Sequence, residues 1–250
     1  MRAKLIVIPY LPIGAQGREL EYAIEGWRRH FKEDYHIVVV GENLPRIEAQ
    51  DLTCIESKRV PDIPGQYRQH LDYVSCFRKV RKAFPDTSGF IFVADDCYAV
   101  NDFDIRDVML LKMNAPDIDY DPNSPNAWRR DAMKTKRALL SGGFPTRNFT
   151  THLPQWFEWD RWEALVERFG MDRESLVIED LYYNIYHGDE TPFLLSREED
   201  KYKLGVYTSF PDEAELDRAF DKKIWITNSP DGFVLALTTR LERYYKDNAI

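Results

Sequence analysis

The sequence contains few cysteines, and their positions suggest no shared role. The three, Cys54, Cys76 and Cys97, are odd in number and lack the paired spacing of a metal site. This excludes a disulfide framework and a cysteine-type zinc centre. We expect all three to be reduced, buried thiols in a cytosolic protein.

The chain also lacks a hydrophobic run long enough to span a bilayer. Residues 1–9 include basic side chains, but the apolar run among them is too short for a signal peptide. We therefore expect no transmembrane segment and a cytoplasmic location. The same residues are interpreted as the first strand of the fold.

An excess of positive charge is absent as well. The formal net charge is -8 at pH 7, which argues against a protein that binds nucleic acid by neutralising phosphates. Several common catalytic signatures are also missing, namely a Gly-Lys-Ser/Thr phosphate loop, a Gly-x-Gly-x-x-Gly turn, a Gly-x-Ser-x-Gly elbow and a His-Glu-x-x-His helix. These absences remove the usual nucleoside-triphosphatase, dinucleotide, hydrolase and zincin interpretations.

The chain does contain the material for a large core. Its 250 residues are 44% hydrophobic and 14% aromatic, which is enough to build a folded domain and makes disorder a poor interpretation. We find no repeat, low-complexity tract or flexible linker. A single domain over residues 1–250 is therefore expected.

Apolar segments in the first half alternate between strand-like and helix-like patterns. Strands are predicted over 5–8, 36–40, 53–56 and 90–93, and helices over 18–31 and 66–84. This alternation predicts an α/β fold with an open, mostly parallel sheet flanked by helices. In the second half the pattern predicts strands over 118–120 and 223–228, and helices over 128–140, 160–169, 179–187, 212–220 and beyond Asp231.

The most informative stretch is 90–98, where a buried strand runs into two adjacent carboxylates, Asp95 and Asp96. Two like charges about 4 Å apart repel by roughly 4 kcal/mol at an effective dielectric constant near 20. A hard divalent cation held by carboxylate oxygens would give a reason for placing them there. The alternative is that both residues begin a turn and are solvated.

Ligands of open α/β sheets bind at the carboxyl ends of the strands. This rule draws attention to Tyr10 after the first strand, to Arg59 after the third, and to Arg68 at the start of the following helix. Arg59 and Arg68 are our candidates for holding phosphate. The alternative for each is an ordinary surface arginine.

Polar residues of the second half could complete a site. His152 lies in an extended segment, where it is either structural or aimed at a reacting group. Glu179 and Asp180 begin a predicted helix, so they either interact with its dipole or include a general base. Asn228 ends a predicted strand and either caps the last helix or contacts a ligand.

The order of these features resembles the GT-A class of glycosyltransferases. Residues 92–97, Phe-Val-Ala-Asp-Asp-Cys, stand where that class has an Asp-x-Asp-like motif after a strand, and Glu179-Asp180 resembles its later acidic pair. The resemblance implies a Rossmann-like GT-A domain with a nucleotide-binding half (1–98) and an acceptor-side half (99–250). It also implies that Asp95 and Asp96 hold Mn²⁺ or Mg²⁺, which binds the diphosphate of a nucleotide sugar.

A nearer resemblance is to the Stealth family of capsular sugar-phosphate transferases. Besides the acidic pair, that family has a His-x-Pro segment, like His152-Leu153-Pro154, and a late strand that closes on asparagine, like 224–228. The likeness covers roughly residues 65–235. The family's opening Trp-Val-Asp motif is absent, because this chain has Ile8-Pro9-Tyr10 instead, and this favours glycosyl over sugar-phosphate transfer.

The resemblance implies a transferase that moves a sugar from a nucleotide-sugar donor to a carbohydrate or glycoconjugate acceptor, in polysaccharide or glycoconjugate synthesis. In that interpretation Arg59 and Arg68 neutralise phosphate, Tyr10 borders the base, and Asp180 or His152 deprotonates the acceptor hydroxyl. Two alternatives stay open: a Stealth-like sugar-phosphate transferase, and a non-catalytic nucleotide-sugar-binding protein. A nucleotidyltransferase is disfavoured because the first loop is neither glycine-rich nor basic.

Overall fold

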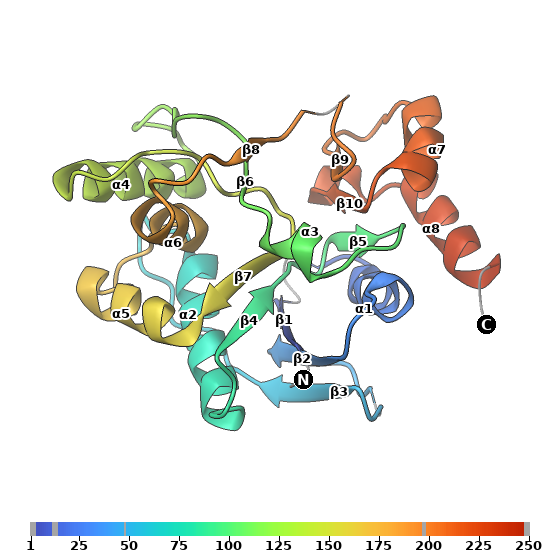
Figure 1. Cartoon of the computed structure of the whole chain (residues 1–250), viewed down its shortest axis with the longest axis horizontal. Helices are drawn as coiled ribbons and strands as arrows, with labels where there is room; N and C mark the ends of the chain where they lie inside the picture. The colour runs from blue at the N-terminus through green and yellow to red at the C-terminus, as the bar shows by residue number, and fades with distance from the viewer. Residues whose placement is uncertain (1–3, 12–14, 48, 197–198, 248–250) are drawn as a thin grey trace.

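A five-stranded sheet forms the centre of the fold (Figure 1). The structure is a computed structural model, and it describes residues 4–11, 15–47, 49–196 and 199–247. The strand order is β3-β2-β1-β4-β7, with β1 Lys4–Tyr10, β2 Tyr35–Gly41, β3 Leu52–Glu56, β4 Gly89–Phe92 and β7 Gln155–Glu158. The first four strands are parallel and β7 is antiparallel to β4, so the predicted mostly parallel α/β sheet is confirmed.

Helices cover both faces of this sheet, which explains the continuous apolar runs of its central strands. On β1, Leu5 and Val7 pack on the side of α2 (Arg68–Ala83). The alternate residues Ile6 and Ile8 pack on the side of α1 (Glu19–His30). Each side chain buried in this way contributes roughly 1.5–3 kcal/mol.

Three more helices share the core on the α2 side. They are α4 Ala127–Ser141, α5 Trp159–Phe169 and α6 Ile178–Tyr186. Aromatic rings dominate this core, among them Phe90 of β4 and Trp159 of α5, whose ring centroids lie 4.1 Å apart. The packing sets the position of α6, the helix that carries the predicted acidic pair.

A second, three-stranded sheet lies against the other side of α1 (Figure 1). Its order is β5-β10-β9, with β5 Cys97–Ala99, β9 Lys203–Val206 and β10 Trp225–Asn228. A short 3-10 helix, Pro230–Gly232, and the helices α7 (Glu213–Lys222) and α8 (Leu235–Asp247) complete this end of the molecule. Because β5 follows β4 after only four residues, the turn that joins the two sheets contains the acidic pair.

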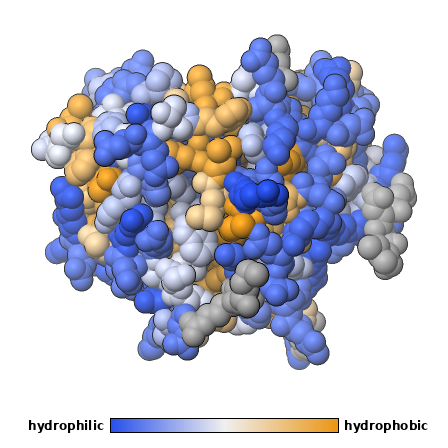
Figure 2. Space-filling view, in the orientation of Figure 1, coloured by the Kyte–Doolittle hydropathy of each residue, from blue (hydrophilic) through white to orange (hydrophobic). Residues whose placement is uncertain are grey.

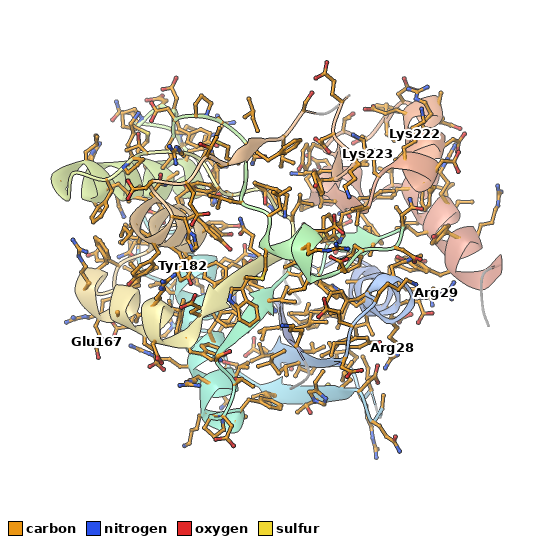
Figure 3. The ribbon with its side chains drawn as sticks, viewed as in Figure 1. Arg28, Arg29, Glu167, Tyr182, Lys222 and Lys223 are labelled. Carbon is orange, nitrogen blue, oxygen red and sulfur yellow. The ribbon has the colours of Figure 1, made fainter. Side chains whose placement is uncertain are left out.

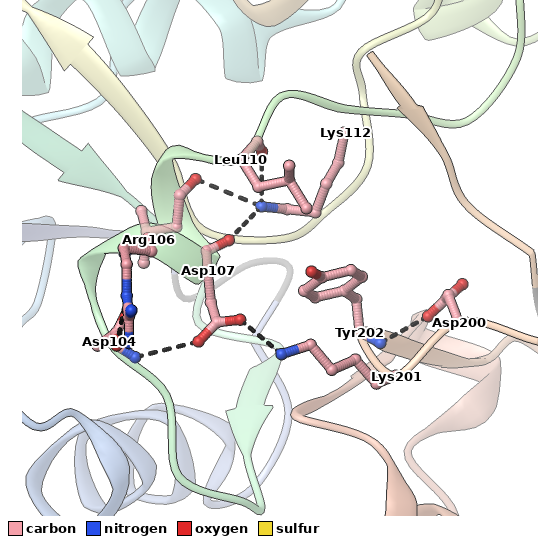
Figure 4. A network of polar contacts seen from close by, with 9 residues as sticks. Asp104, Arg106, Asp107, Leu110, Lys112, Asp200, Lys201 and Tyr202 are labelled. Carbon is pink, nitrogen blue, oxygen red and sulfur yellow. Dashed lines mark hydrogen bonds and ion pairs between the residues drawn. The ribbon is translucent and has the colours of Figure 1, made fainter.

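A polar network fastens the middle of the chain to the second sheet (Figure 4). The short helix α3 (Ile105–Met109) precedes β6 (Lys112–Met113), which pairs with β8 (Phe193–Leu194). The buried Nζ of Lys112 donates hydrogen bonds to the carbonyl oxygens of Asp107, Val108 and Leu110, which caps the end of α3. Lys201 Nζ donates to the Asp107 carboxylate at 2.9 Å, so α3 is tied to the segment before β9.

Apolar side chains are exposed across the middle of one face (Figure 2). They include Met109 and Leu110 at the end of α3 and Phe193 and Leu194 of β8. None of the helices in the described part of the chain is long and apolar enough to span a bilayer.

Several local predictions were wrong. β1 continues through Pro9 to Tyr10, which is possible because β4 pairs with β1 only at Ile6 and Val7, so no bond on that side needs the missing N–H of proline. Residues 118–120 form no strand, and the short strands β5, β6, β8 and β9 were not predicted. Cys54 is exposed rather than buried, although all three cysteines are free thiols.

Candidate active site

A cavity of about 510 Å³ opens beyond the carboxyl ends of β1 and β4, where ligands of open α/β sheets bind. Its walls come from both halves of the chain. The elements that contribute include the end of β1, the starts of α1, α2, α4 and α6, the β4–β5 turn, residues 150–155 and the end of β10. Its volume is in the range of small-molecule sites.

Six of the predicted site residues line this cavity together, although they are far apart in the sequence. They are Arg59, Asp95, Asp96, His152, Glu179 and Asn228. Three others, Tyr10, Arg68 and Asp180, are not part of its lining. The structure therefore brings together most of the predicted site and shows different surroundings for the rest.

Asp95 and Asp96 form the turn between β4 and β5 and are half-buried. The Oδ1 atom of Asp96 is buried and accepts no hydrogen bond within the described structure. Burial raises the pKa of both carboxyls, and the two residues repel each other, which adds to the rise at Asp95. A buried oxygen without a donor costs free energy, so this turn favours a bound cation.

The oxygen ligands available at Asp95 and Asp96 fit one kind of cation site. Within residues 4–11, 15–47, 49–196 and 199–247, no three or more His, Cys, Asp or Glu side chains are placed to hold a metal ion. Mg²⁺ is commonly bound by one or two carboxylates together with substrate phosphates and water. Asp95 and Asp96 match that arrangement, because they offer carboxylate oxygens at an open cavity rather than a closed cage.

A third carboxylate, Glu19, was not predicted as part of the site. It lies in the first turn of α1, is only 3% exposed, and lines the cavity. Its Oε1 accepts a hydrogen bond from Asn228 Nδ2 at 2.7 Å, and Asn228 Oδ1 accepts one from Tyr98 Oη at 2.6 Å. Burial raises the pKa of Glu19, and its charge in turn raises the pKa of Asp96. Its position at the start of the helix that follows the first strand was the signal that could have identified it.

These contacts define the role of Asn228. Its side-chain amide is engaged by Glu19, Tyr98 and the Ser229 carbonyl. Its backbone N–H donates to the Asp96 carbonyl oxygen at 3.3 Å. Asn228 therefore holds the acidic turn, Asp95 and Asp96, in place, and it lines the cavity from the end of β10.

The two candidate phosphate-binding arginines share one buried carboxylate, Asp72. Arg59 Nε donates to Asp72 Oδ2 at 2.9 Å, and Asp72 is 1% exposed. Arg68 Nη1 pairs with Asp62 at 2.9 Å, and its Nε lies 3.9 Å from the same Asp72. Only Arg59 lines the cavity, so the charge of Arg68 is held outside it.

The two acidic residues at the start of α6 point in different directions. Asp180 is fully buried, and its Oδ1 accepts hydrogen bonds from Phe149 N at 2.6 Å and Thr150 Oγ1 at 3.5 Å. Glu179 lines the cavity, is 8% exposed, and accepts no hydrogen bond from another described residue. Burial raises the pKa of Glu179 to about 7. Asp180 thus supports a loop, whereas Glu179 faces the cleft.

Packing of the next turn fixes this orientation of α6. Tyr182 lies between α6 and the β7–α5 junction (Figure 3). Its hydroxyl accepts a hydrogen bond from the backbone N–H of Glu158 at 2.9 Å. Rotation of the helix would break this contact, so Glu179 is held toward the cavity.

His152 stands at the rim of the cavity in an uncommon backbone conformation. Its φ is 57°, a region that costs free energy for a residue with a side chain and that recurs at functional sites. The residue as a whole is exposed. Desolvation by neighbouring protein atoms lowers the pKa of the imidazole, and the charge of Lys203, whose Nζ donates to the Thr151 carbonyl, lowers it further.

Tyr10 lines a neighbouring cavity of about 470 Å³ between α1, α8 and residues 45–47. Burial raises the pKa of its phenol, and the charges of Asp95 and Glu19 add to the effect. Tyr10 is therefore close to the acidic turn without lining the same cavity. The role of this residue in binding a base stays a prediction.

Several aromatic residues of the cleft were not predicted as part of the site. Tyr67, Tyr73, Trp128 and Tyr207 all line it. Tyr67 and Tyr73 lie within the predicted helix 66–84, and helical spacing alone does not distinguish a buried core stripe from a cleft wall.

No protein-family model matches this chain, and no curated protein matches it. One matching solved structure is described as the "crystal structure of a glycosyltransferase involved in the glycosylation of the major capsid of PBCV-1". It is 11% identical to this chain, with a TM-score of 0.46, over 97% of this chain and 99% of that one. The likeness to the Stealth family stays a prediction, and the function proposed below rests on the residues of the cleft.

Proposed function

We propose that this protein is a metal-dependent glycosyltransferase that moves a sugar from a nucleotide-sugar donor to a hydroxyl of a carbohydrate or glycoconjugate acceptor. The observation that carries the proposal is the acidic turn of Asp95 and Asp96 at the cleft, with a buried carboxylate oxygen that lacks a donor. Arg59 and Glu179 line the same cavity. A site for a metal ion, an arginine that binds phosphate and a candidate base are the parts that this reaction needs.

The acidic turn and Arg59 would bind the donor's diphosphate. Asp95 and Asp96 would hold Mn²⁺ or Mg²⁺, which supplies positive charge to the diphosphate and stabilises it as a leaving group. Arg59 reaches the cavity while Asp72 orients its guanidinium through Nε. Its two terminal nitrogens make no hydrogen bond with another described residue, so they are available for phosphate oxygens.

We assign the general base to Glu179 rather than to Asp180. A base works best when its pKa lies near the operating pH, and the pKa of Glu179 is raised to about 7 by burial. Asp180 uses its carboxylate to hold Phe149 and Thr150. Glu179 would remove the proton of the acceptor hydroxyl as that oxygen attacks the sugar.

The proposal is tested by calorimetry with UDP- and GDP-sugars. Binding is expected only with Mn²⁺ or Mg²⁺ present and should disappear after chelation or in Asp96→Asn. Asp160→Asn is the matched control, because Asp160 on α5 has a 95% exposed side chain. Donor binding that survives both chelation and Asp96→Asn would contradict the metal-dependent site.

One observation favours a second candidate, sugar-phosphate transfer. His152 lines the same cavity as Asp95 and Asp96, which would bring its imidazole to the diphosphate of the donor. The released nucleotide distinguishes the reactions, because glycosyl transfer leaves a nucleoside diphosphate and sugar-phosphate transfer leaves a nucleoside monophosphate. Metal-dependent binding without either product would identify a non-catalytic binding protein.

A further inference from the structure

Three side chains at the start of α2 form a hydrogen-bonded chain along the cleft wall. Tyr67 Oη donates to Gln69 Oε1 at 2.5 Å, and Gln69 Nε2 donates to Tyr73 Oη at 2.5 Å. All three residues line the cavity. Neither the acidic turn nor the proposed base takes part in this row of hydrogen bonds.

The chain of bonds leaves one hydroxyl proton without an acceptor. A phenol has one proton to donate, and an amide has one accepting and one donating end. Tyr67 donates its proton to Gln69, whereas Tyr73 receives a bond from Gln69 and keeps its own proton. No other described residue accepts that proton. If the Gln69 side-chain amide were flipped, its nitrogen would donate to Tyr67, and Tyr67 would have the free proton instead. In either orientation one phenol of the cleft has a hydroxyl proton to donate.

The ring of Tyr73 is held in a defined place. It packs edge-on against Phe92 at 5.1 Å between ring centroids and stacks on Phe77 at 6.0 Å. Phe92 is the last residue of β4, just before the acidic turn. Burial raises the pKa of Tyr73 well above its usual value, and the charges of Glu179 and Asp95 raise it further. The phenol therefore stays protonated, and both carboxylates are near enough to act on it electrostatically.

We propose that the Tyr73 hydroxyl donates a hydrogen bond to the sugar of the bound donor, and so helps to select and orient that sugar. The inference rests on the proposed function. The sugar being transferred must lie between its diphosphate, placed at Asp95 and Asp96, and the acceptor hydroxyl, placed at Glu179. Tyr73 lines the cavity together with both sites, and because its oxygen accepts from Gln69, its own proton is left to donate.

The test compares ligands with and without the sugar. Affinities of wild type and Tyr73→Phe are measured calorimetrically with Mn²⁺ for UDP against UDP-glucose and for GDP against GDP-mannose. Tyr73→Phe should weaken binding of the nucleotide sugar about tenfold while nucleoside diphosphate affinity stays within about twofold. Tyr186→Phe is the control, because its hydroxyl donates to the Arg161 carbonyl oxygen away from the cavity.

A second variant keeps the test decisive if Tyr73→Phe fails to fold. In Gln69→Glu the carboxylate accepts hydrogen bonds from both phenols, so the Tyr73 hydroxyl donates to residue 69 and no longer to the sugar. The same loss of nucleotide-sugar affinity is expected, with nucleoside diphosphate affinity nearly unchanged. An unchanged ratio of the two affinities, or an equal loss for both ligands, would overturn the inference. A wild-type protein that binds neither nucleoside diphosphate with Mn²⁺ would overturn the proposed function itself, which is seen before any variant is made.

Discussion

Replacing Glu179 with glutamine should stabilise the folded protein above neutral pH while it removes transfer activity. The carboxyl is buried, has no hydrogen bond from another described residue, and has a pKa raised from 4.5 to about 7 by desolvation. Glutamine has nearly the same volume and no charge. It therefore removes the cost of burying a carboxylate and also removes the proposed base.

The pH dependence follows from the direction of this shift. Below about pH 4.5 the group is protonated in both folded and unfolded states, so it contributes no penalty. Between that value and about pH 7 the unfolded chain loses the proton while the folded protein keeps it, and stability falls as pH rises. The full shift corresponds to at most about 3 kcal/mol. Because the glutamine amide is also desolvated, we expect Glu179→Gln to gain about 1–2 kcal/mol at about pH 8.

Urea unfolding of metal-free protein at about pH 4.5 and about pH 8 measures the effect. The difference in unfolding free energy between variant and wild type should be near zero at the lower pH and should favour the variant at the higher pH. Glu167→Gln is the control, since Glu167 is exposed on α5 (Figure 3) and its loss should change stability by no more than about 0.5 kcal/mol. Transfer activity of Glu179→Gln should fall about 10²–10⁴-fold. A variant that is less stable than wild type at about pH 8, or a gap independent of pH, would refute this account of Glu179.

Three further substitutions test the remaining assignments. Asp180→Ala should lower the unfolding free energy by about 1–3 kcal/mol in urea titrations, because the loop that Asp180 holds loses its buried acceptor; unchanged stability would contradict that role. Arg59→Lys should weaken Mn²⁺-dependent UDP or GDP binding about tenfold, while Arg68→Lys leaves it nearly unchanged, and equal losses in calorimetry would reverse the distinction between them. His152→Gly should be more stable than His152→Ala by about 1 kcal/mol in thermal unfolding, because glycine adopts the positive φ without strain; the opposite order would show that the backbone there is not strained.

The sequence predicted the first half of the fold well, because its signals are local. The apolar run of residues 5–8 and the helical stripe of residues 18–31 each reappear within a few residues of the predicted bounds. The prediction failed for β5 and β9, which contain three and four residues. These two segments are specified by the strands they pair with rather than by a period in their own sequence.

Sequence alone established the mostly parallel sheet and the place where its acidic turn emerges, since burial on both faces requires continuous apolar strands and the residues that follow them must lie at one edge. It could not decide between Glu179 and Asp180. Neighbouring residues on a helix point about 100° apart, so which one faces the cleft depends on the rotation of α6, and that is set by contacts such as the one from Glu158 to Tyr182. The partners of the acidic turn, Glu19 and Tyr73 among them, come from distant segments. Only the packing of α1 and α2 against β4 brings those side chains to one cavity.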